Sequence, residues 1–351
     1  MLSGWEIFLE AFIKVIVVFG LLLNVTILLV WMERKVVADM QNRVGPDRAG
    51  PWGILQTLAD AVKLIFKENV TPHRVEFGLY IAAPIAALVP ALLIFLVIPV
   101  GQPFTIGDRV ISLGGTDLNI GLLYILALSS LAVYAIVLAG WSSGSKYPLL
   151  GAVRASAQMI SYEAAMGLAL VPVILFTGTT SLARIVDSQA GGTFGFLGVW
   201  NLVLLPSFVI FFIAGVAETN RPPFDLVEAE SEIVGGYHTE YSGFRFALFF
   251  LAEYINMFNI SAITVVVFFG GWHGPDFGLG APFTWILPLV WFFAKTFAFV
   301  FVFIWIRASL PRMRYDQLMS FGWKRLIPIS LAWIVLATVA VGVRRMGFPW
   351  A

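Results

Sequence analysis

A run of acidic residues in the second half of the chain offers the clearest chemistry. Its carboxylates surround one cation, Arg221, and are Glu218, Asp225, Glu228, Glu230 and Glu232. Because like charges held close together cannot all ionise, some of these carboxyl groups should have raised pKa values and titrate together. The run therefore predicts a group that stores and releases protons. A solvated acidic surface and a calcium site are the alternatives, although the ligand spacing of an EF-hand loop is absent.

The surroundings of the run favour proton storage over a solvated surface. The run directly follows a long apolar segment, is interleaved with apolar residues and is followed by Glu240. Pro222 and Pro223 should end the preceding helix. Asp225 could then cap a short helix with Glu228 three residues later. These features predict an acidic loop over about 218–243 at the membrane surface.

Charged residues also lie within the apolar segments themselves. They are Lys14, Glu163, Glu253 and Lys295. Each costs roughly 2.5 to 3.5 kcal/mol on membrane-insertion scales, so each is expected to have a function. Two interpretations remain open. Glu253 could pair with Lys295 and simply lock two helices together, or Glu163 and Glu253 could belong to a proton relay.

The chain has few residues that could hold a redox centre. It has no cysteine, and its three histidines, His73, His238 and His273, lie outside the apolar core segments. Iron–sulfur clusters and bis-histidine haem therefore cannot form from this chain. We expect no metal site and no cofactor bound by this chain, so that any electrons it uses must come from a partner.

The elements that position these residues follow from composition. With 59% hydrophobic and 12% charged residues and a mean hydropathy of +0.88, the chain has too much apolar surface for a soluble core. Eight segments are long enough to span a bilayer as helices: 15–32, 77–100, 118–139, 158–177, 199–217, 246–272, 282–306 and 326–343. They lack the alternation of barrel strands. The sequence predicts an all-α integral membrane protein that forms a single membrane domain over residues 1–351.

The basic residues predict the orientation of this domain. They concentrate in the odd-numbered loops, which should therefore face the cytoplasm. Both termini are then expected on the outer face of a bacterial inner membrane. Glu6 and Glu10 occupy the place where a removable signal peptide would carry basic residues, so the first helix should stay as a span.

The first cytoplasmic loop should contain a helix of its own. Over residues 52–67, apolar residues recur at helical spacing while Asp60 and Lys63 lie on the opposite, polar side. Pro51 suits the start of such a helix. A helix with one polar face should lie in the membrane interface. It could be a surface brace or the wall of a binding cavity.

Several runs of sequence together resemble one known family. They are AETNRPPFDLVEAESE at 217–232, GYHTEYSG at 236–243, ERK at 33–35 with QNRVGP at 41–46, LQTLADAVKL at 55–64, and WIR at 305–307 with PRMRYDQLM at 311–319. In this order they resemble the quinone-site membrane subunits of respiratory complex I, which are called the H subunit in bacteria and NADH dehydrogenase subunit 1 in mitochondria. The resemblance covers nearly the whole chain.

The resemblance implies the partners and the substrate. The chain would be an eight-helix subunit of a proton-translocating NADH:quinone oxidoreductase, inactive alone. It would dock on soluble subunits that hold the flavin and the iron–sulfur clusters, beside small membrane subunits and lipid, and without nucleic acid. Quinone would be the substrate.

The resemblance also implies roles for individual residues. The proton relay would comprise Glu163, Glu218, Asp225, Glu228, Glu230, Glu232, Glu240 and Glu253. The wall of the quinone cavity would include Arg34, Asp60, Lys63, Phe246 and Arg307. The supporting cations would be Arg221, Lys295, Arg312 and Arg314.

Two alternative functions remain open. The first is the homologous subunit of a membrane-bound hydrogenase or of a ferredoxin- or coenzyme-linked dehydrogenase. The complete ERK run at 33–35 and the amphipathic helix favour the quinone enzyme. The second is a stand-alone ion transporter, which typically shows internal repeats and broken helices around a site at mid-membrane. Here the acidic residues concentrate at the cytoplasmic edge instead.

Overall fold

The computed structural model of the chain is a bundle of long helices. It describes residues 4–106, 109–111, 114–190, 201–225, 234–275 and 283–345. The helices are α1 (Gly4–Met40), α2 (Gln56–Phe66), α3 (Phe77–Val97), α4 (Gly121–Ser142), α5 (Lys146–Thr177), α6 (Leu182–Ser188), α7 (Leu205–Glu218), α9 (Gly243–Phe268), α10 (Phe283–Ser309), α11 (Tyr315–Phe321) and α12 (Ile327–Arg345). Short helical turns are η1 (Pro51–Gly53), η3 (Asn201–Leu204), η4 (Gly236–His238) and η5 (Gly322–Leu326).

The predicted all-α fold is confirmed, with one small departure. Strands β1 (Phe104–Ile106) and β2 (Arg109–Ile111) form an antiparallel hairpin between α3 and α4. Seven of the described helices are long and apolar enough to cross a membrane, and α7 is a shorter apolar helix. Together with η3, α7 occupies the fifth predicted segment. The expectation of about eight membrane helices is therefore confirmed.

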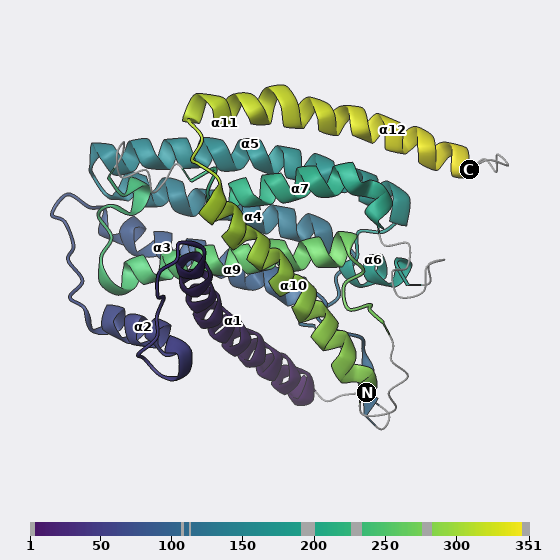
Figure 1. Ribbon diagram of the computed structural model, residues 1–351, viewed down its shortest axis with the longest axis horizontal. Helices are drawn as coiled ribbons and strands as arrows, with labels where there is room; N and C mark the ends of the chain where they lie inside the picture. Colours follow the sequence, from purple (N-terminus) through teal and green to yellow (C-terminus); the bar gives the residue numbers. More distant parts are fainter. Residues whose placement is uncertain are drawn as a thin grey trace.

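The helices form a central bundle with three peripheral members. The closest packing joins α3 to α4, α4 to α5, α5 to α7 and α3 to α9. Figure 1 shows α1 and α10 crossing this bundle obliquely, while α12 runs along α5 at its edge. In its most apolar stretch α9 is 78% buried and α12 only 17%. Helix α9 is thus the core of the fold, and α12 presents most of its apolar surface outward.

The two ends of the bundle differ. Figure 1 shows α2 at one end and both chain termini toward the opposite end. We refer to these as the α2 end and the termini end. Because helices cross the bundle in alternating directions, the acidic segment after α7 and the start of α9 return to the α2 end. The fold therefore gathers the predicted site residues from distant parts of the chain.

The amphipathic helix is present and shorter than predicted. It begins at Gln56 because Pro51–Gly53 form a separate turn in which Trp52 and Gly53 have φ angles of 52° and 74°. A side chain at Gly53 would meet the Pro46 carbonyl group at 2.3 Å, so glycine is required there. The apolar side of α2 stays exposed at Leu58, Val62, Ile65 and Phe66. This surface suits contact with lipid or with a partner.

Candidate functional site

The end of α7 is shaped by its prolines and by one glutamine. Pro222 and Pro223 cannot donate backbone hydrogen bonds, so the helix stops at Glu218 and the chain turns through Asn220, whose φ angle is 51°. Gln158 on α5 secures the turn, because its Nε2 donates to the carbonyl groups of Ala217 and Phe224 at 2.8 and 2.9 Å. The turn directs Arg221 into the protein.

Arg221 lies at the centre of a buried ion cluster. Its Nη1 is 3.0 Å from Glu33 Oε2 on α1, and its Nε is 2.8 Å from Glu253 Oε1 on α9. The guanidinium carbon lies 4.3 Å from the centre of the Tyr254 ring. Glu33 also pairs with Arg307 of α10. Two carboxylates and two guanidinium groups are therefore joined, although they come from four separate segments.

The ion cluster is balanced in charge, and removing one of its members should destabilise the protein. The side chains of Arg221 and Glu33 are only 4% and 9% exposed. Attraction between the opposite charges offsets the cost of removing them from water. Removing one member would leave a buried charge without its partner. A change of charge beside the cluster would therefore act directly on its members.

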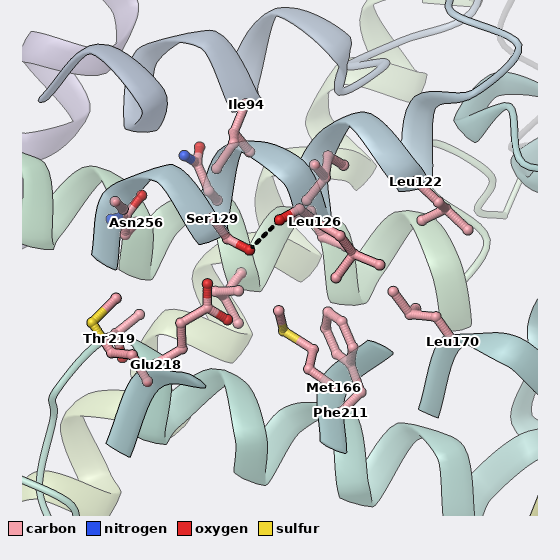
Figure 2. A pocket seen from close by; sticks show the side chains of 16 residues that line it. Ile94, Leu122, Leu126, Ser129, Met166, Leu170, Phe211, Glu218, Thr219 and Asn256 are labelled. Atoms are coloured by element: carbon pink, nitrogen blue, oxygen red, sulfur yellow. Dashed lines mark hydrogen bonds between the residues drawn. The ribbon is translucent and has the colours of Figure 1, made fainter. Parts of the chain in front are cut away.

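A second acidic pair lies deeper in the bundle. Glu163 on α5 accepts a hydrogen bond from Ser130 of α4, and its charge is close enough to interact with Glu218. Figure 2 shows the carboxyl group of Glu218 pointing from α7 toward the helix that carries Ser129. The structure thus brings Glu163 and Glu218 within range of each other's charge, and their membership of one relay stays a prediction.

Narrow cavities connect Glu218 with the ion cluster. One has a water-accessible volume of about 40 Å³ and is bordered by Glu218, Asn220, Glu253 and Asn256. A second, of about 20 Å³, is bordered by Glu218, Ser129, Asn256 and Asn259 (Figure 2). About 10 to 15 Å³ is enough to hold one water molecule. Both cavities therefore have room for water beside the acidic residues.

Sequence reasoning missed three residues of this region. Glu33 was noted as part of a motif but not as a site residue, and Asn256 and Asn259 were not singled out. Glu253, Asn256 and Asn259 are spaced three apart on α9, so they form one polar stripe within an apolar helix. That spacing was a visible signal. The pairing of Glu33 with Arg221 joins positions 188 residues apart and had no local signal.

An open cavity adjoins the ion cluster at the α2 end. Its volume is about 350 Å³, and its lining includes Glu33, Arg34, Arg43 and Arg307. Arg34 reaches from this cavity to Asp60 of α2, with 2.6 Å between Nη1 and Oδ2. Arg34 and Arg307, two predicted members of the quinone-cavity wall, thus border one space.

Asp60 is held in its ionised form. Burial acts to raise its pKa, but hydrogen bonds from Arg34 and Gln56 and the charges of Arg34 and Lys63 outweigh burial, so the pKa of Asp60 lies below its ordinary value. Lys63 is 3.5 Å from Asp60 while its own side chain is 70% exposed. Asp60 therefore faces α1, whereas Lys63 extends outward.

The segment before α9 is lined with aromatic residues. The ring of Phe246 lies against the ring of His238, and burial lowers the pKa of His238 to about 4. Burial also raises the pKa of Tyr241, which stacks on Tyr80, to about 12. Both groups are therefore uncharged near neutral pH. The Glu240 carbonyl group accepts a hydrogen bond from Tyr80.

The predicted cations other than Arg221 have varied surroundings. Arg312 pairs with buried Asp225 at 3.3 Å, and Arg314 pairs with exposed Asp316 at 3.2 Å. Lys295 donates to the Phe269 and His273 carbonyl groups just past the end of α9. Phe269 is sixteen residues beyond Glu253, or about 24 Å along a helix. The suggested pair of Glu253 with Lys295 is therefore wrong: Glu253 pairs with Arg221, and Lys295 caps α9.

Part of the acidic run cannot be placed. Glu228, Glu230 and Glu232, and the short helix expected after Asp225, lie outside the described residues. Across the segments that the structure describes, no group of three or more His, Asp or Glu side chains is placed to hold a metal ion.

Comparison with known proteins gives consistent matches. The family model described as NADH dehydrogenase matches residues 13–338. The H subunit of NADH-quinone oxidoreductase from Frankia casuarinae is 52% identical over 342 residues, which cover 96% of this chain and 75% of that protein. The protein of the same name from Frankia alni is 52% identical over 332 residues, which cover 94% of this chain and 72% of that protein.

Proposed function

Because the chain belongs to the NADH dehydrogenase family, we propose that it is the membrane subunit that borders the quinone cavity and carries the acidic link to proton translocation. It is a multi-pass membrane protein and a subunit of an NADH-quinone oxidoreductase, so other subunits of that complex are its partners. Quinone is the substrate of the complex. Electrons reach it from flavin and iron–sulfur clusters in soluble partner subunits.

One observation carries this proposal. The buried ion cluster of Glu33, Arg221, Glu253 and Arg307 lies between an open cavity and a deeper pair of carboxyl groups. The open cavity is bordered by Glu33 and Arg307, and the narrow cavity on the other side is bordered by Glu253 and Glu218. Ionisable groups are thus continuous from the surface of the α2 end into the bundle.

This arrangement can couple quinone reduction to proton movement. Reduction of a quinone to a quinol takes up two electrons and two protons, and charge changes first in the cavity. Glu33 and Arg307 border that cavity and respond to its charge first. A proton taken up by Glu33 weakens its pair with Arg221, which leaves the guanidinium group to Glu253 alone. The response is thereby passed to Glu218 and Glu163.

The orientation follows from the same proposal. The α2 end, with the open cavity and the basic loops, faces the cytoplasm and the soluble partners. Both termini then lie on the outer face of the cell membrane. The exposed apolar faces of α1 and α12 contact lipid or small membrane subunits.

The test uses the assembled complex with Glu253→Gln. We expect quinone reduction and proton pumping to fall together by about tenfold or more, because glutamine cannot take up or release a proton and leaves Arg221 without one of its two carboxylate partners. Electron transfer from NADH to a water-soluble acceptor should stay unchanged, because it does not use this chain. Glu10→Gln is the matched control, since Glu10 forms an ion pair with Lys14 about 34 Å along α1 from Glu33. Wild-type pumping in Glu253→Gln would contradict the proposal.

A further inference from the structure

The cavity between α3, α4, α5, α7 and α9 contains two polar atoms that need a partner. They are Glu218 Oε2 and Asn259 Oδ1, which are both buried and have no hydrogen-bond partner among the described residues, since the nearby Ser129 hydroxyl donates to the Leu126 carbonyl group. Buried polar atoms of native proteins nearly always have a partner in the protein or in ordered water. Two such atoms at one cavity therefore point to a shared ligand.

The orientation of Asn259 is fixed by its other contact. Its Nδ2 donates to the Ala91 carbonyl group at 2.8 Å. A carbonyl group can only accept, so the amide nitrogen must face Ala91 and the amide oxygen must face the cavity. The side chain of Asn259 is 1% exposed. Its oxygen is thus an acceptor held rigidly toward the space beside Glu218.

The size and lining of the cavity identify the ligand. The water-accessible volume of about 20 Å³ holds one or two water molecules and excludes anything larger. Ser129, Thr219 and Asn256 add polar groups on the side of Glu218, while Leu122 and Leu170 line the cavity elsewhere (Figure 2). The ligand is therefore small, polar and able to donate to an amide oxygen, as water is.

We propose that one or two ordered water molecules bridge Glu218 Oε2 and Asn259 Oδ1, and that Asn259 is a positioning residue for the carboxyl group of Glu218. The proposal rests on the proposed function, in which Glu218 belongs to the relay. A water that donates to Asn259 keeps a second hydrogen and its lone pairs for Glu218. It can accept from the protonated carboxyl group or donate to the carboxylate, so it serves both states of Glu218.

In the same arrangement, the bridging water is the last member of the proposed chain of polar groups along α9. Beyond Asn259 on α9 the cavity is bordered by Ile260 and Ile263, and the hydroxyl groups of Ser261 and Thr264 bond within the helix. Hydrated groups therefore stop at Asn259. The bridged water holds a proton near Glu218 and passes it back toward Glu163 or Glu253.

The test is infrared difference spectroscopy on the assembled complex during quinone reduction, in ordinary and in ¹⁸O water. In the wild type we expect a carboxyl band that Glu218→Gln removes and a water band that shifts with ¹⁸O. Asn259→Leu should abolish the water band, shift the carboxyl band and slow quinone-coupled proton uptake by about three- to tenfold, as for the loss of one hydrogen bond. Thr264→Val, which removes a buried hydroxyl of the same helix, should leave both bands unchanged.

The outcomes separate the two proposals. Normal turnover in Glu218→Gln would overturn the proposed function. Impaired turnover in Glu218→Gln with unchanged bands in Asn259→Leu would overturn only the water bridge. If Asn259→Leu does not assemble, a high-resolution structure of the wild-type complex decides: water density between the two side chains is expected, and a dry cavity there would refute the bridge.

Discussion

Arg221 acts in three directions at once. It reaches Glu33 through Nη1 and Glu253 through Nε, and its planar face covers the ring of Tyr254. A lysine has the same charge but only one nitrogen on a flexible chain, so it cannot reproduce the contacts that Arg221 makes from two separate nitrogens of one planar group. We therefore expect the geometry of the guanidinium group to contribute to function in addition to its charge.

Arg221→Lys should consequently separate assembly from activity. We expect the complex to assemble while quinone reduction falls about tenfold, because one carboxylate loses its charge-assisted hydrogen bond. Arg221→Ala should destabilise the chain by roughly 3 to 5 kcal/mol and impair assembly. Native gels and quinone reductase rates measure the two effects. The control is Arg184→Lys on α6, because Arg184 is exposed and lies outside the ion cluster, so the exchange should be neutral. Equal activity in Arg221→Lys and wild type would show that the two-nitrogen geometry of the guanidinium group is not needed.

Asp60 allows a prediction about pH. Its pKa lies below its ordinary value, so the carboxylate is charged throughout pH 5 to 8. The stability it contributes is complete above that ordinary value and is lost as the pH falls through the lowered pKa. Asp60→Asn should slow quinone reduction by only about two- to fivefold, since Arg34 is 45% exposed. The shape of the pH–rate profile between 5 and 8 should not change.

The same variant distinguishes a cavity wall from a brace. A purely structural α2 predicts unchanged quinone kinetics and unchanged inhibition by quinone analogues in the assembled Asp60→Asn complex. Lys63→Gln is the natural comparison, because Lys63 lies on the same helix but is largely exposed. It should have the smaller effect of the two.

At the scale of helices and loops, two buried glutamines perform similar tasks at opposite ends of the bundle. Gln158 fastens the turn after α7. Gln189 fastens α6 to α9 by donating to the Ile185 and Val266 carbonyl groups. Only the turn held by Gln158 carries a residue of the ion cluster, namely Arg221. The pair is therefore a matched test of what the turn contributes to function.

Gln158→Leu and Gln189→Leu should each destabilise the chain by about 2 to 4 kcal/mol, since two buried carbonyl groups lose their donor. Beyond this common loss, Gln158→Leu should lower the quinone reductase rate per assembled complex, because the position of Arg221 depends on the turn. Gln189→Leu should lower only the amount of complex. Thermal denaturation and rates normalised to assembled complex separate these effects. Identical specific activities would show that the turn is structural only.

The positions of the helices were predictable from the sequence, whereas the contacts between their charged side chains were not. Hydropathy located the spans because a helix in lipid must be apolar over about 20 residues. Periodicity located α2, although the turn at Trp52 and Gly53 that shortens it depends on contact with Pro46. The pairing of Glu33 with Arg221, and the capping of α9 by Lys295, join segments far apart in sequence. Such contacts leave no periodic signal, so charge counting alone could suggest the wrong partner for Glu253.

At the scale of the whole molecule, the topology can be tested with single introduced cysteines, because the chain itself has no cysteine. Ser188 lies at the exposed end of α6, toward the termini end, and Glu68 is exposed just after α2. A membrane-impermeant maleimide should label Ser188→Cys in intact cells and Glu68→Cys only after the membrane is opened. Labelling in the reverse pattern would invert the proposed orientation. That residues 1–351 act as a single membrane domain remains a prediction.

The half of α9 nearest the termini has an electrical consequence. From Ile260 to Phe268 every side chain is buried, and the two hydroxyl groups of this stretch bond within the helix. We expect such a dry, apolar stretch to have a lower dielectric constant than a cavity that holds water, and therefore to carry a larger share of the membrane voltage. Moving one elementary charge through 100 mV takes about 2.3 kcal/mol. In the proposed relay, a proton that reaches Glu218 through the narrow cavities would therefore have crossed little of this voltage, and the apolar stretch of α9 would help to insulate the charged membrane.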